Sequence, residues 1–176
     1  MKTLKTAVPL TTPAINAKAP ALRTVGKVLC VGATSAALAC TGTQVRPAPP
    51  SENCPPGAVE AMEKLDIGVG KIHPLKFPGT QRQVITVREG YTEWEVIGDW
   101  EGLPYPTRLS GRLVFGDGRV YGRLTEAHTP KGERIPVCMA LYGTDLKLGL
   151  VRKPGGDADT AQVFSVGTVK AVERFE

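Results

Sequence analysis

Short runs of β-forming residues, most of them with one apolar face, recur through most of this sequence. They follow one another at intervals of roughly eight to twelve residues, which is typical of a β-sandwich or a small barrel. The 20 glycines and 15 prolines of the chain supply frequent turns between them. The predicted strands are residues 83–88, 91–97, 107–115, 119–126, 135–142, 146–152 and 162–175.

The clearest hairpin lies at residues 109–124. Its first strand carries apolar side chains at Leu109, Leu113 and Phe115, and its second strand alternates in the same way. A Gly-Asp-Gly sequence at 116–118 joins the two strands. Glycine accepts the positive φ angles that a tight hairpin turn requires, so we predict antiparallel pairing across this turn.

One short helix is expected before the strands, at residues 58–65. Val59, Met62 and Leu65 recur at helical spacing there, and prolines just upstream suit the first turn of a helix. Gly68 follows and ends it. The predicted fold is therefore mostly β, an antiparallel β-sandwich or small barrel with one short N-terminal helix, formed by a single domain at 54–176.

The net charge of +5 is confined to the beginning of the chain. Residues 1–39 contain five of the 22 basic residues and no acid, so 17 basic and 17 acidic residues remain from position 40 onward. A basic patch is the electrostatic feature that polyanion binding requires. We therefore expect no nucleic acid partner.

Residues 1–39 have the pattern of a secretory signal. A basic stretch ends at Lys27, and the small and apolar residues 28–39 follow it. The sequence Ala37-Leu38-Ala39-Cys40 at its end resembles the lipobox of bacterial lipoproteins, although Ala37 stands where that family prefers leucine. The resemblance implies cleavage before Cys40 and lipidation of its thiol. The alternative is an ordinary secretory signal cut at the same place, which leaves Cys40 as a free thiol.

The resemblance also implies a location and a partner. A lipid on Cys40 would attach the protein to a membrane, and Thr41 stands where an aspartate tends to retain such proteins at the inner membrane, so an outer membrane lipoprotein is expected. Without the lipid, the protein would be secreted or periplasmic. Residues 41–53 contain three prolines and one large aliphatic residue, so we predict that 40–53 is a lipidated cysteine followed by an extended tether.

The remaining cysteines predict one disulfide bond. Cys30 leaves with the signal and Cys40 carries the lipid, so Cys54 and Cys138 remain in an oxidising compartment. Two free thiols or an intermolecular bond are the alternatives. The chain has no Cys-x-x-Cys pair and only two histidines, and we expect neither a metal site nor a cofactor.

Catalytic signatures are missing from the sequence. It contains no zinc-protease, serine-hydrolase, P-loop or kinase motif, and we expect a protein that is not an enzyme. His73 and His128 are each followed closely by a proline and are interpreted as surface or turn residues. Glu93 and Glu95 share one face of a predicted strand, where exposed acidic alternation explains them better than paired catalysis.

Aromatic residues cluster in one region and provide the candidate site. Trp94 alternates with glutamates and is assigned to the core, whereas Trp100 falls in a predicted loop beside carboxylates. Such a loop can present a platform to a sugar or a protein, or it can simply pack onto the sheet. The candidate ligand contacts are Asp99, Trp100, Glu101 and Tyr105.

Two function classes follow from these interpretations. The favoured one is a non-enzymatic lipoprotein of the cell envelope whose β-domain binds an envelope protein or a glycan through residues 99–105. The alternative is a small envelope hydrolase that uses carboxylates near the same loop. The sequence itself names neither a ligand nor a biological process.

Overall fold

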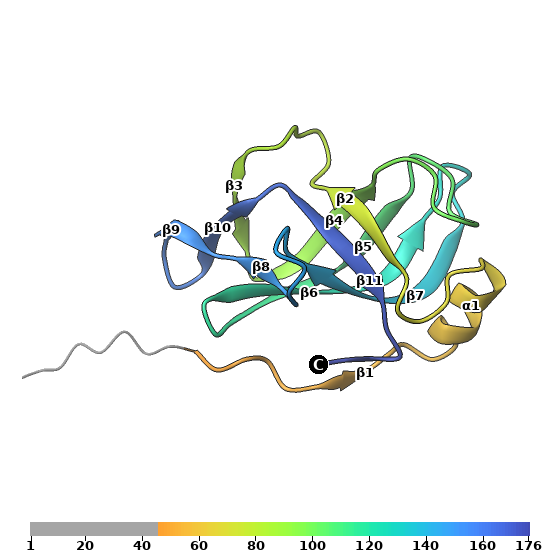
Figure 1. Cartoon of the computed structure of the whole chain (residues 1–176), viewed down its shortest axis with the longest axis horizontal. Coiled ribbons are helices and arrows are strands. Elements are labelled where there is room, and N and C mark those ends of the chain that lie inside the picture. The colour runs from red at the N-terminus through yellow and green to blue at the C-terminus, as the bar shows by residue number, and fades with distance from the viewer. Residues whose placement is uncertain (1–45) are drawn as a thin grey trace, which may run out of the picture. The chain divides into compact units, whose positions relative to one another are not determined.

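The alternating strands close into a six-stranded antiparallel β-barrel in the computed structural model, which describes residues 46–176 (Figure 1). The predicted fold class is confirmed, and of its two forms the barrel is the one observed. Around the barrel, each strand pairs with the next, and the last pairs with the first. In this order the strands are β5 (Arg108–Gly116), β4 (Gly90–Val96), β2 (Ile72–Lys76), β11 (Val166–Ala171), β7 (Arg134–Tyr142) and β6 (Arg119–His128).

A smaller sheet continues from one end of the barrel (Figure 1). It consists of β3 (Val84–Arg88), β10 (Thr160–Phe164) and β9 (Lys153–Gly156), with β10 in the middle. β3 leads directly into β4, and β10 leads directly into β11, so two long strands contribute to both sheets. A two-residue strand, β8 (Leu150–Val151), pairs with β6.

The core consists of the inward-facing residues of these strands. Trp94 and Val96 of β4 are buried, and so are their counterparts on the neighbouring strands. Phe77 packs edge-on against Trp94, with ring centroids 5.7 Å apart. Burying a large apolar side chain contributes roughly 1.5 to 3 kcal/mol. The assignment of Trp94 to the core is therefore correct.

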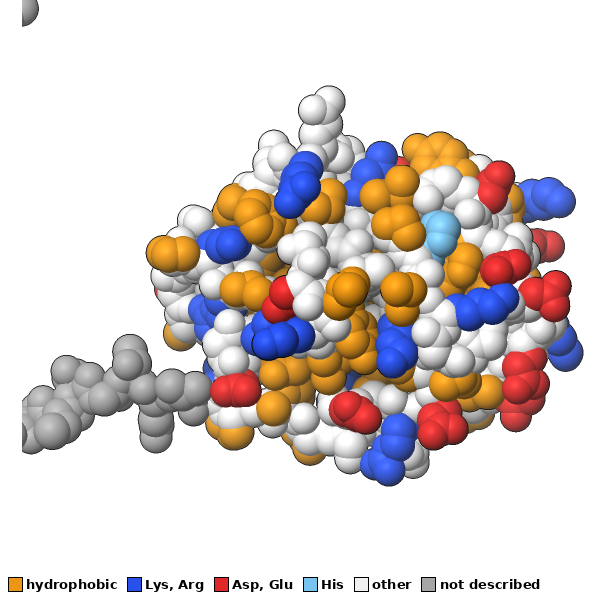
Figure 2. All heavy atoms as spheres, viewed as in Figure 1, with side chains coloured by type: hydrophobic (Ala, Val, Ile, Leu, Met, Phe, Trp, Pro, Cys, Tyr) orange, Lys and Arg blue, Asp and Glu red, His pale blue; other side chains and the backbone are white. Residues whose placement is uncertain are grey.

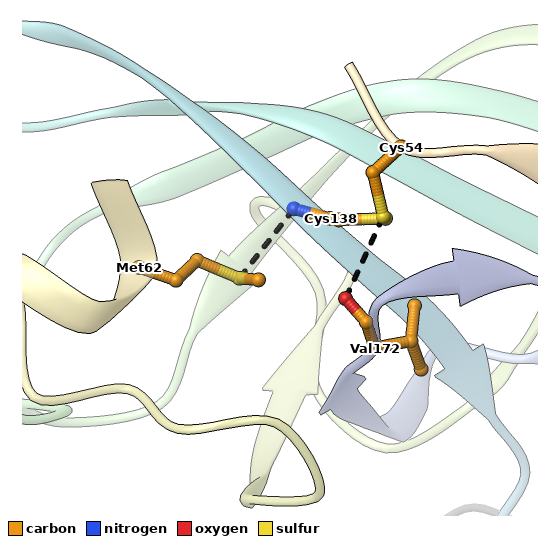
Figure 3. The surroundings of a disulfide bond; sticks show 4 residues. All are labelled: Cys54, Met62, Cys138 and Val172. Atoms are coloured by element: carbon orange, nitrogen blue, oxygen red, sulfur yellow. Dashed lines mark hydrogen bonds between the residues drawn. A yellow bond between two sulfur atoms is a disulfide. The ribbon is translucent and has the colours of Figure 1, made fainter. Parts of the chain in front are cut away.

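The predicted helix is α1 (Ala58–Lys64), which covers β7. It starts after Gly57, whose φ of 75° sets the direction of the first turn. Ala58 and Met62 form its buried face. The amide of Cys138 donates a hydrogen bond of 3.4 Å to the sulfur of Met62, so this face contacts the middle of the strand (Figure 3).

The predicted disulfide joins Cys54 and Cys138 (Figure 3). The two Cα atoms are 5.4 Å apart, and the cysteines are separated by 84 positions in the chain. The amide of Val172 donates to the carbonyl oxygen of Cys138 at 2.9 Å, which brings the end of β11 to the same place. The bond therefore fixes the segment before α1 to the middle of β7.

Residues 46–53, which we call the N-terminal arm, are extended and lie against the barrel (Figure 1). Its last two residues form β1 (Glu52–Asn53), which pairs with β12 (Arg174–Phe175). The sequence assigned the arm to a tether because it has little apolar surface. The arm instead docks on the barrel through hydrogen bonds and ion pairs, which its apolar content does not predict.

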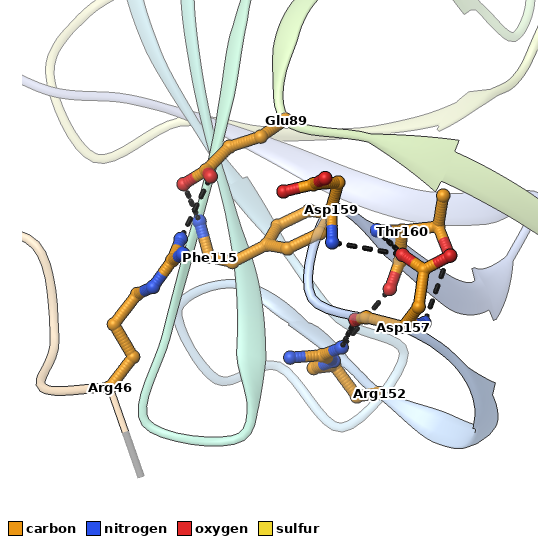
Figure 4. A network of polar contacts seen from close by, with 7 residues as sticks. All are labelled: Arg46, Glu89, Phe115, Arg152, Asp157, Asp159 and Thr160. Atoms are coloured by element: carbon orange, nitrogen blue, oxygen red, sulfur yellow. Dashed lines mark hydrogen bonds and ion pairs between the residues drawn. The ribbon is translucent and has the colours of Figure 1, made fainter. Parts of the chain in front are cut away.

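The beginning of the arm is held at the tip of the β5–β6 hairpin (Figure 4). Arg46 forms an ion pair of 2.8 Å with Glu89, and its carbonyl oxygen accepts a hydrogen bond from the amide of Asp117. Glu89 also accepts a hydrogen bond of 2.9 Å from the amide of Phe115. That bond, and then Arg46, hold the pKa of the Glu89 carboxyl below its usual value. The charged form of Glu89 thus connects the arm to the hairpin.

Four expectations about the strands were wrong or incomplete. The predicted strand at 146–152 is reduced to the two residues of β8. β2 was not predicted, because Pro74 lies inside it and proline is normally confined to strand edges and ends. Lys153–Gly156 was not predicted as a strand, but it forms β9 on the edge of the small sheet. The final predicted run, 162–175, is divided among β10, β11 and β12.

Charged side chains are unevenly distributed over the face that Figure 2 shows. Acidic side chains gather at the end where Figure 1 places α1, and both signs mix over the rest of that face. Within residues 46–176, no helix combines the length and the apolar character needed to cross a membrane. Cys40 and the predicted signal lie outside the described residues.

Removing the disulfide should destabilise the domain by about 4 to 5 kcal/mol, because it closes a loop of more than eighty residues in the unfolded chain. Cys54→Ser should show this loss in denaturant unfolding. Cys138→Ser and the double variant should lose about as much, since the bond is already absent in each single variant. A double variant that loses twice as much as either single one would contradict a shared contribution.

Candidate functional site

The site begins with the turn of the β5–β6 hairpin. Asp117 and Gly118 have φ angles of 44° and 68°, as a two-residue hairpin turn requires. The predicted turn is therefore present, and it sets a regular register from Gly116 opposite Arg119 to Gly111 opposite Leu124. Apolar side chains of both strands face the barrel interior over this stretch.

A β-bulge then interrupts the register. Ser110 lies opposite Glu126 and Arg108 opposite His128, so Thr125 is one extra residue on β6. Without it, the strict alternation after Leu124 would turn Glu126 and His128 toward the barrel interior. The extra residue instead turns Ala127 into the core and both polar side chains outward.

Gly111 provides the space that the bulge needs. A Cβ atom at this position would lie 2.7 Å from the Cα of Leu124 and would also overlap the carbonyl group of Arg123. Both neighbours are backbone atoms and cannot rotate away. The glycine therefore allows the two strands to approach closely where the register changes.

A polar network lies on the outer face of the bulge. The hydroxyl group of Ser110 is 2.8 Å from Nε2 of His128, and Oε1 of Glu126 is 3.0 Å from the same nitrogen. On β4, the hydroxyl group of Tyr91 donates a hydrogen bond of 2.6 Å to Glu93. This bond to a carboxylate raises the pKa of Tyr91, because ionising the phenol would lose it.

These side chains line an open hollow of about 540 Å³, which we call the bulge groove. Tyr91 stands at its border with 73% of its surface exposed. Arginines contribute most of the charge, since three of them line the groove against two glutamates. The lining residues are Glu52, Tyr91, Ser110, Gly111, Arg112, Arg123, Thr125, Glu126, His128 and Arg134.

The geometry of the Ser110–His128 pair favours binding over nucleophilic catalysis. In a catalytic triad, the serine and the carboxylate bind different nitrogens of the imidazole, so that one activates the nucleophile and the other orients the ring. Here Ser110 and Glu126 both contact Nε2. Ser110 is also only 6% exposed. The pair therefore lacks the arrangement of a catalytic triad.

The loop at 99–105, which is the candidate site from the sequence, does not expose Trp100 to solvent. Trp100 is only 4% exposed and stacks on His73, with ring centroids 5.0 Å apart. The expectation that Trp100 is an exposed ligand contact is therefore corrected, and the alternative, a loop packed onto the barrel, describes it. His73 is itself held by a hydrogen bond of 2.9 Å between Nε2 and the carbonyl oxygen of Ile97.

The other three candidates of that loop are mostly engaged within the molecule. Asp99 accepts a hydrogen bond of 2.8 Å from the amide of Tyr105, and Glu101 forms an ion pair of 2.9 Å with Lys71. Tyr105 remains 49% exposed. The loop thus offers one accessible aromatic ring rather than a platform of several.

The paired glutamates of β4 are each matched by a cation. Glu95 lies 3.0 Å from Lys76 and raises the pKa of that lysine, and Glu93 lies 3.7 Å from Arg108. The predicted exposed acidic alternation therefore describes them incompletely, because both glutamates form ion pairs and the Glu95 side chain is only 12% exposed.

A second hollow lies beside the bend between β3 and β4. It has a volume of about 370 Å³ and a more apolar lining, which includes Phe77, Val87 and Leu113. Thr92 lines it as well, and its buried hydroxyl group has no hydrogen-bond partner among the described residues. Tyr91 borders both hollows.

The bulge groove was not predicted from the sequence, because the extra residue Thr125 is what turns Glu126 and His128 toward it. His128 was interpreted as a turn or surface histidine, and Ser110 was not singled out. The Gly-Asp-Gly turn predicts the register only as far as the bulge. Gly111 was the available signal, because a glycine inside a strand pattern often marks a bulge.

Metal binding has no support in the described part of the chain. Within residues 46–176, no group of three or more histidine, cysteine, aspartate or glutamate side chains is placed to hold an ion. His128 and Glu126 approach each other, but their other neighbours in the groove are Ser110 and arginines. The groove therefore has the composition of a hydrogen-bonding and ion-pairing surface.

Gly111→Ala should disturb the groove and destabilise the domain by about 1 to 3 kcal/mol, because the new methyl group meets backbone that cannot move aside. Urea unfolding measures the loss, and the imidazole resonances of His128 should shift. Gly68→Ala is the matched control, since its Cβ has open space and its φ is not positive. A Gly111 variant as stable as the Gly68 variant would show that the close approach is not required.

No protein-family model matches the sequence, and no curated protein matches it either. Function is therefore inferred from the residues of the barrel and its groove, together with the signal-like residues 1–40.

Proposed function

We propose that this protein is a lipoprotein of the cell envelope, attached through Cys40 and present at the outer membrane, whose barrel binds an envelope protein or a glycan without catalysing a reaction. The ligand surface is the bulge groove rather than the loop at 99–105. One observation carries this choice. Tyr91 is the most exposed of the large apolar side chains among the described residues, and it borders the bulge groove. Arginines and the hydrogen-bonded pair of Ser110 and His128 line this groove.

The composition of the groove supports a binding role. Tyrosine and arginine are the residues most often found among those that dominate the energy of protein interfaces. Tyr91 offers apolar area with a hydroxyl group, while Arg112 and Arg134 offer planar donors for carboxylates or sugar hydroxyls. The Arg112 and Arg134 side chains are exposed and available from solvent.

The runner-up function is a small envelope hydrolase, and the contact between Ser110 and His128 is what favours it. The position of Glu126 on the same imidazole nitrogen argues against it, because no carboxylate is then left to orient the ring. A serine-reactive fluorophosphonate probe that labels Ser110 specifically would favour the hydrolase over the binding protein.

Lipid attachment predicts a clear change on Cys40→Ser. The wild-type protein should carry the mass of a lipid and remain with membranes, whereas the variant should lose that mass and become soluble. Mass spectrometry and membrane fractionation measure both effects. A wild-type protein that is already soluble and carries no lipid would contradict the anchor while leaving the groove untouched.

Loss of the groove side chains should abolish ligand capture. Tyr91→Ala combined with Arg134→Ala should lower crosslinking to the envelope partner by at least about tenfold, since truncating a dominant interface residue costs on the order of 2 kcal/mol. Tyr105→Ala is the matched control, because Tyr105 is an exposed aromatic of the loop at 99–105. If Tyr105→Ala abolishes capture and the groove variant does not, the surface is assigned wrongly.

A further inference from the structure

The N-terminal arm places a carboxylate between two arginines of the β5–β6 hairpin. Arg112 of β5 and Arg123 of β6 lie directly opposite each other in the register. Like charges in this position repel each other and destabilise a sheet unless an anion lies between them. Both guanidinium groups donate to the same oxygen of Glu52. The hairpin thus contains an anion site, and the arm fills it.

The deeper arginine of this site is poised for a further contact. Arg123 is only 5% exposed, and it donates to the carbonyl oxygen of Pro50 as well as to Glu52. Its Nε atom is buried and has no hydrogen-bond partner among the described residues. A buried donor without a partner is costly, so the site is not fully satisfied by the arm. Arg112 and Arg123 both line the bulge groove, which makes the anion site part of it.

The occupant itself indicates which ligand the site accepts. It is an extended, proline-containing peptide with one glutamate, which the hairpin holds through the carboxylate and a backbone carbonyl. An acidic peptide segment from another protein offers the same groups. The arm supplies both groups from one extended backbone, so an acidic peptide is the ligand that most directly reproduces them.

Most contacts of the arm are exposed, and its most deeply buried contact is with Arg123. Six of its eight residues are exposed, and it forms only a two-residue ladder with β12. The pairs Arg46–Glu89 and Arg112–Glu52 are solvent-exposed, and exposed pairs contribute little to stability. The barrel does not depend on the arm for closure, because its six strands pair without it. The disulfide at Cys54 prevents the separation from continuing into α1.

We propose that the Arg112–Arg123 pair binds an acidic, extended peptide of a partner protein, and that Glu52 is an internal competitor that the partner displaces. The inference rests on the proposed function of the bulge groove. The partner peptide and the docked arm then cannot occupy the Arg112–Arg123 pair at the same time. The docked arm leaves five residues between Cys40 and Arg46, which span at most about 18 Å, and the released arm leaves thirteen before Cys54, which span about 45 Å. Capture of the partner therefore lengthens the tether.

A peptide with the arm's own sequence, Arg-Pro-Ala-Pro-Pro-Ser-Glu-Asn, tests the competition. It is labelled with a fluorophore and titrated into the soluble Cys40→Ser protein and into the same protein with Glu52→Gln. Because Glu52→Gln removes the internal carboxylate, the peptide should bind this variant on the order of tenfold more tightly. The peptide with glutamine in place of glutamate should bind neither protein well, and Arg112→Gln should weaken binding of the acidic peptide by a similar factor.

Amide exchange reports on the arm directly. Saturating peptide should speed hydrogen exchange at Glu52 and Asn53 of the Cys40→Ser protein, while exchange in β7 stays unchanged. Equal affinities with and without Glu52, or an arm that stays protected at saturation, would overturn the competition. Binding that survives Arg112→Gln would overturn the site.

A separate probe distinguishes the partner class. If an oligosaccharide of alternating glucuronate and N-acetylglucosamine displaces the arm and the peptide does not, the peptide assignment is overturned. If the peptide displaces the arm but Tyr91→Ala with Arg134→Ala leaves envelope capture intact, the proposed function of the groove fails and the anion site stands alone. If that variant abolishes capture and the peptide does not bind, the proposed function stands and this inference fails.

Discussion

The antiparallel pairing of β5 with β6 is the interaction on which both the barrel and its candidate site depend. It joins the two ends of the six-stranded series from β5 to β6, so the barrel has no free edge among these strands. The same pairing contains the bulge that turns Glu126 and His128 outward, and its outer face receives the N-terminal arm. Closure, the polar groove and arm docking are thus three consequences of one hairpin.

Much of the fold could be predicted because its signals are local. The helix at 58–64 follows from apolar spacing and flanking residues, and the hairpin turn at 117–118 follows from the demand for positive φ. The disulfide followed from counting the cysteines that remain after the predicted cleavage and lipidation. β2 and β9 could not be predicted in this way, because Pro74 and a Pro-Gly-Gly sequence disfavour strands locally. Their pairing partners, β11 and β10, outweigh that preference.

The candidate site was harder to predict because its geometry depends on distant residues. Alternation alone assigns Glu126 to the wrong face, and only the extra residue at Thr125 corrects it. Trp100 lies in a loop with the composition of a binding surface, yet its ring is buried and stacks on His73 of β2. The arm was predicted to be an undocked tether because it has little apolar surface. Its contacts are instead ion pairs with Arg112 and Arg123, which lie far along the chain. Each of these outcomes is a tertiary effect.

The disulfide also determines how the molecule responds to mechanical force. Tension applied at the N-terminus passes through Cys54 and enters the barrel at Cys138, in the middle of β7. α1 lies within the crosslinked loop, so tension that passes from Cys54 to Cys138 does not pull along the backbone of this helix. If a partner is held on the outer face of β6, the tension between the partner and Cys138 passes across the β6–β7 ladder. Pulling on the N-terminal end of the chain should therefore extend the arm while the contact between α1 and β7 stays intact.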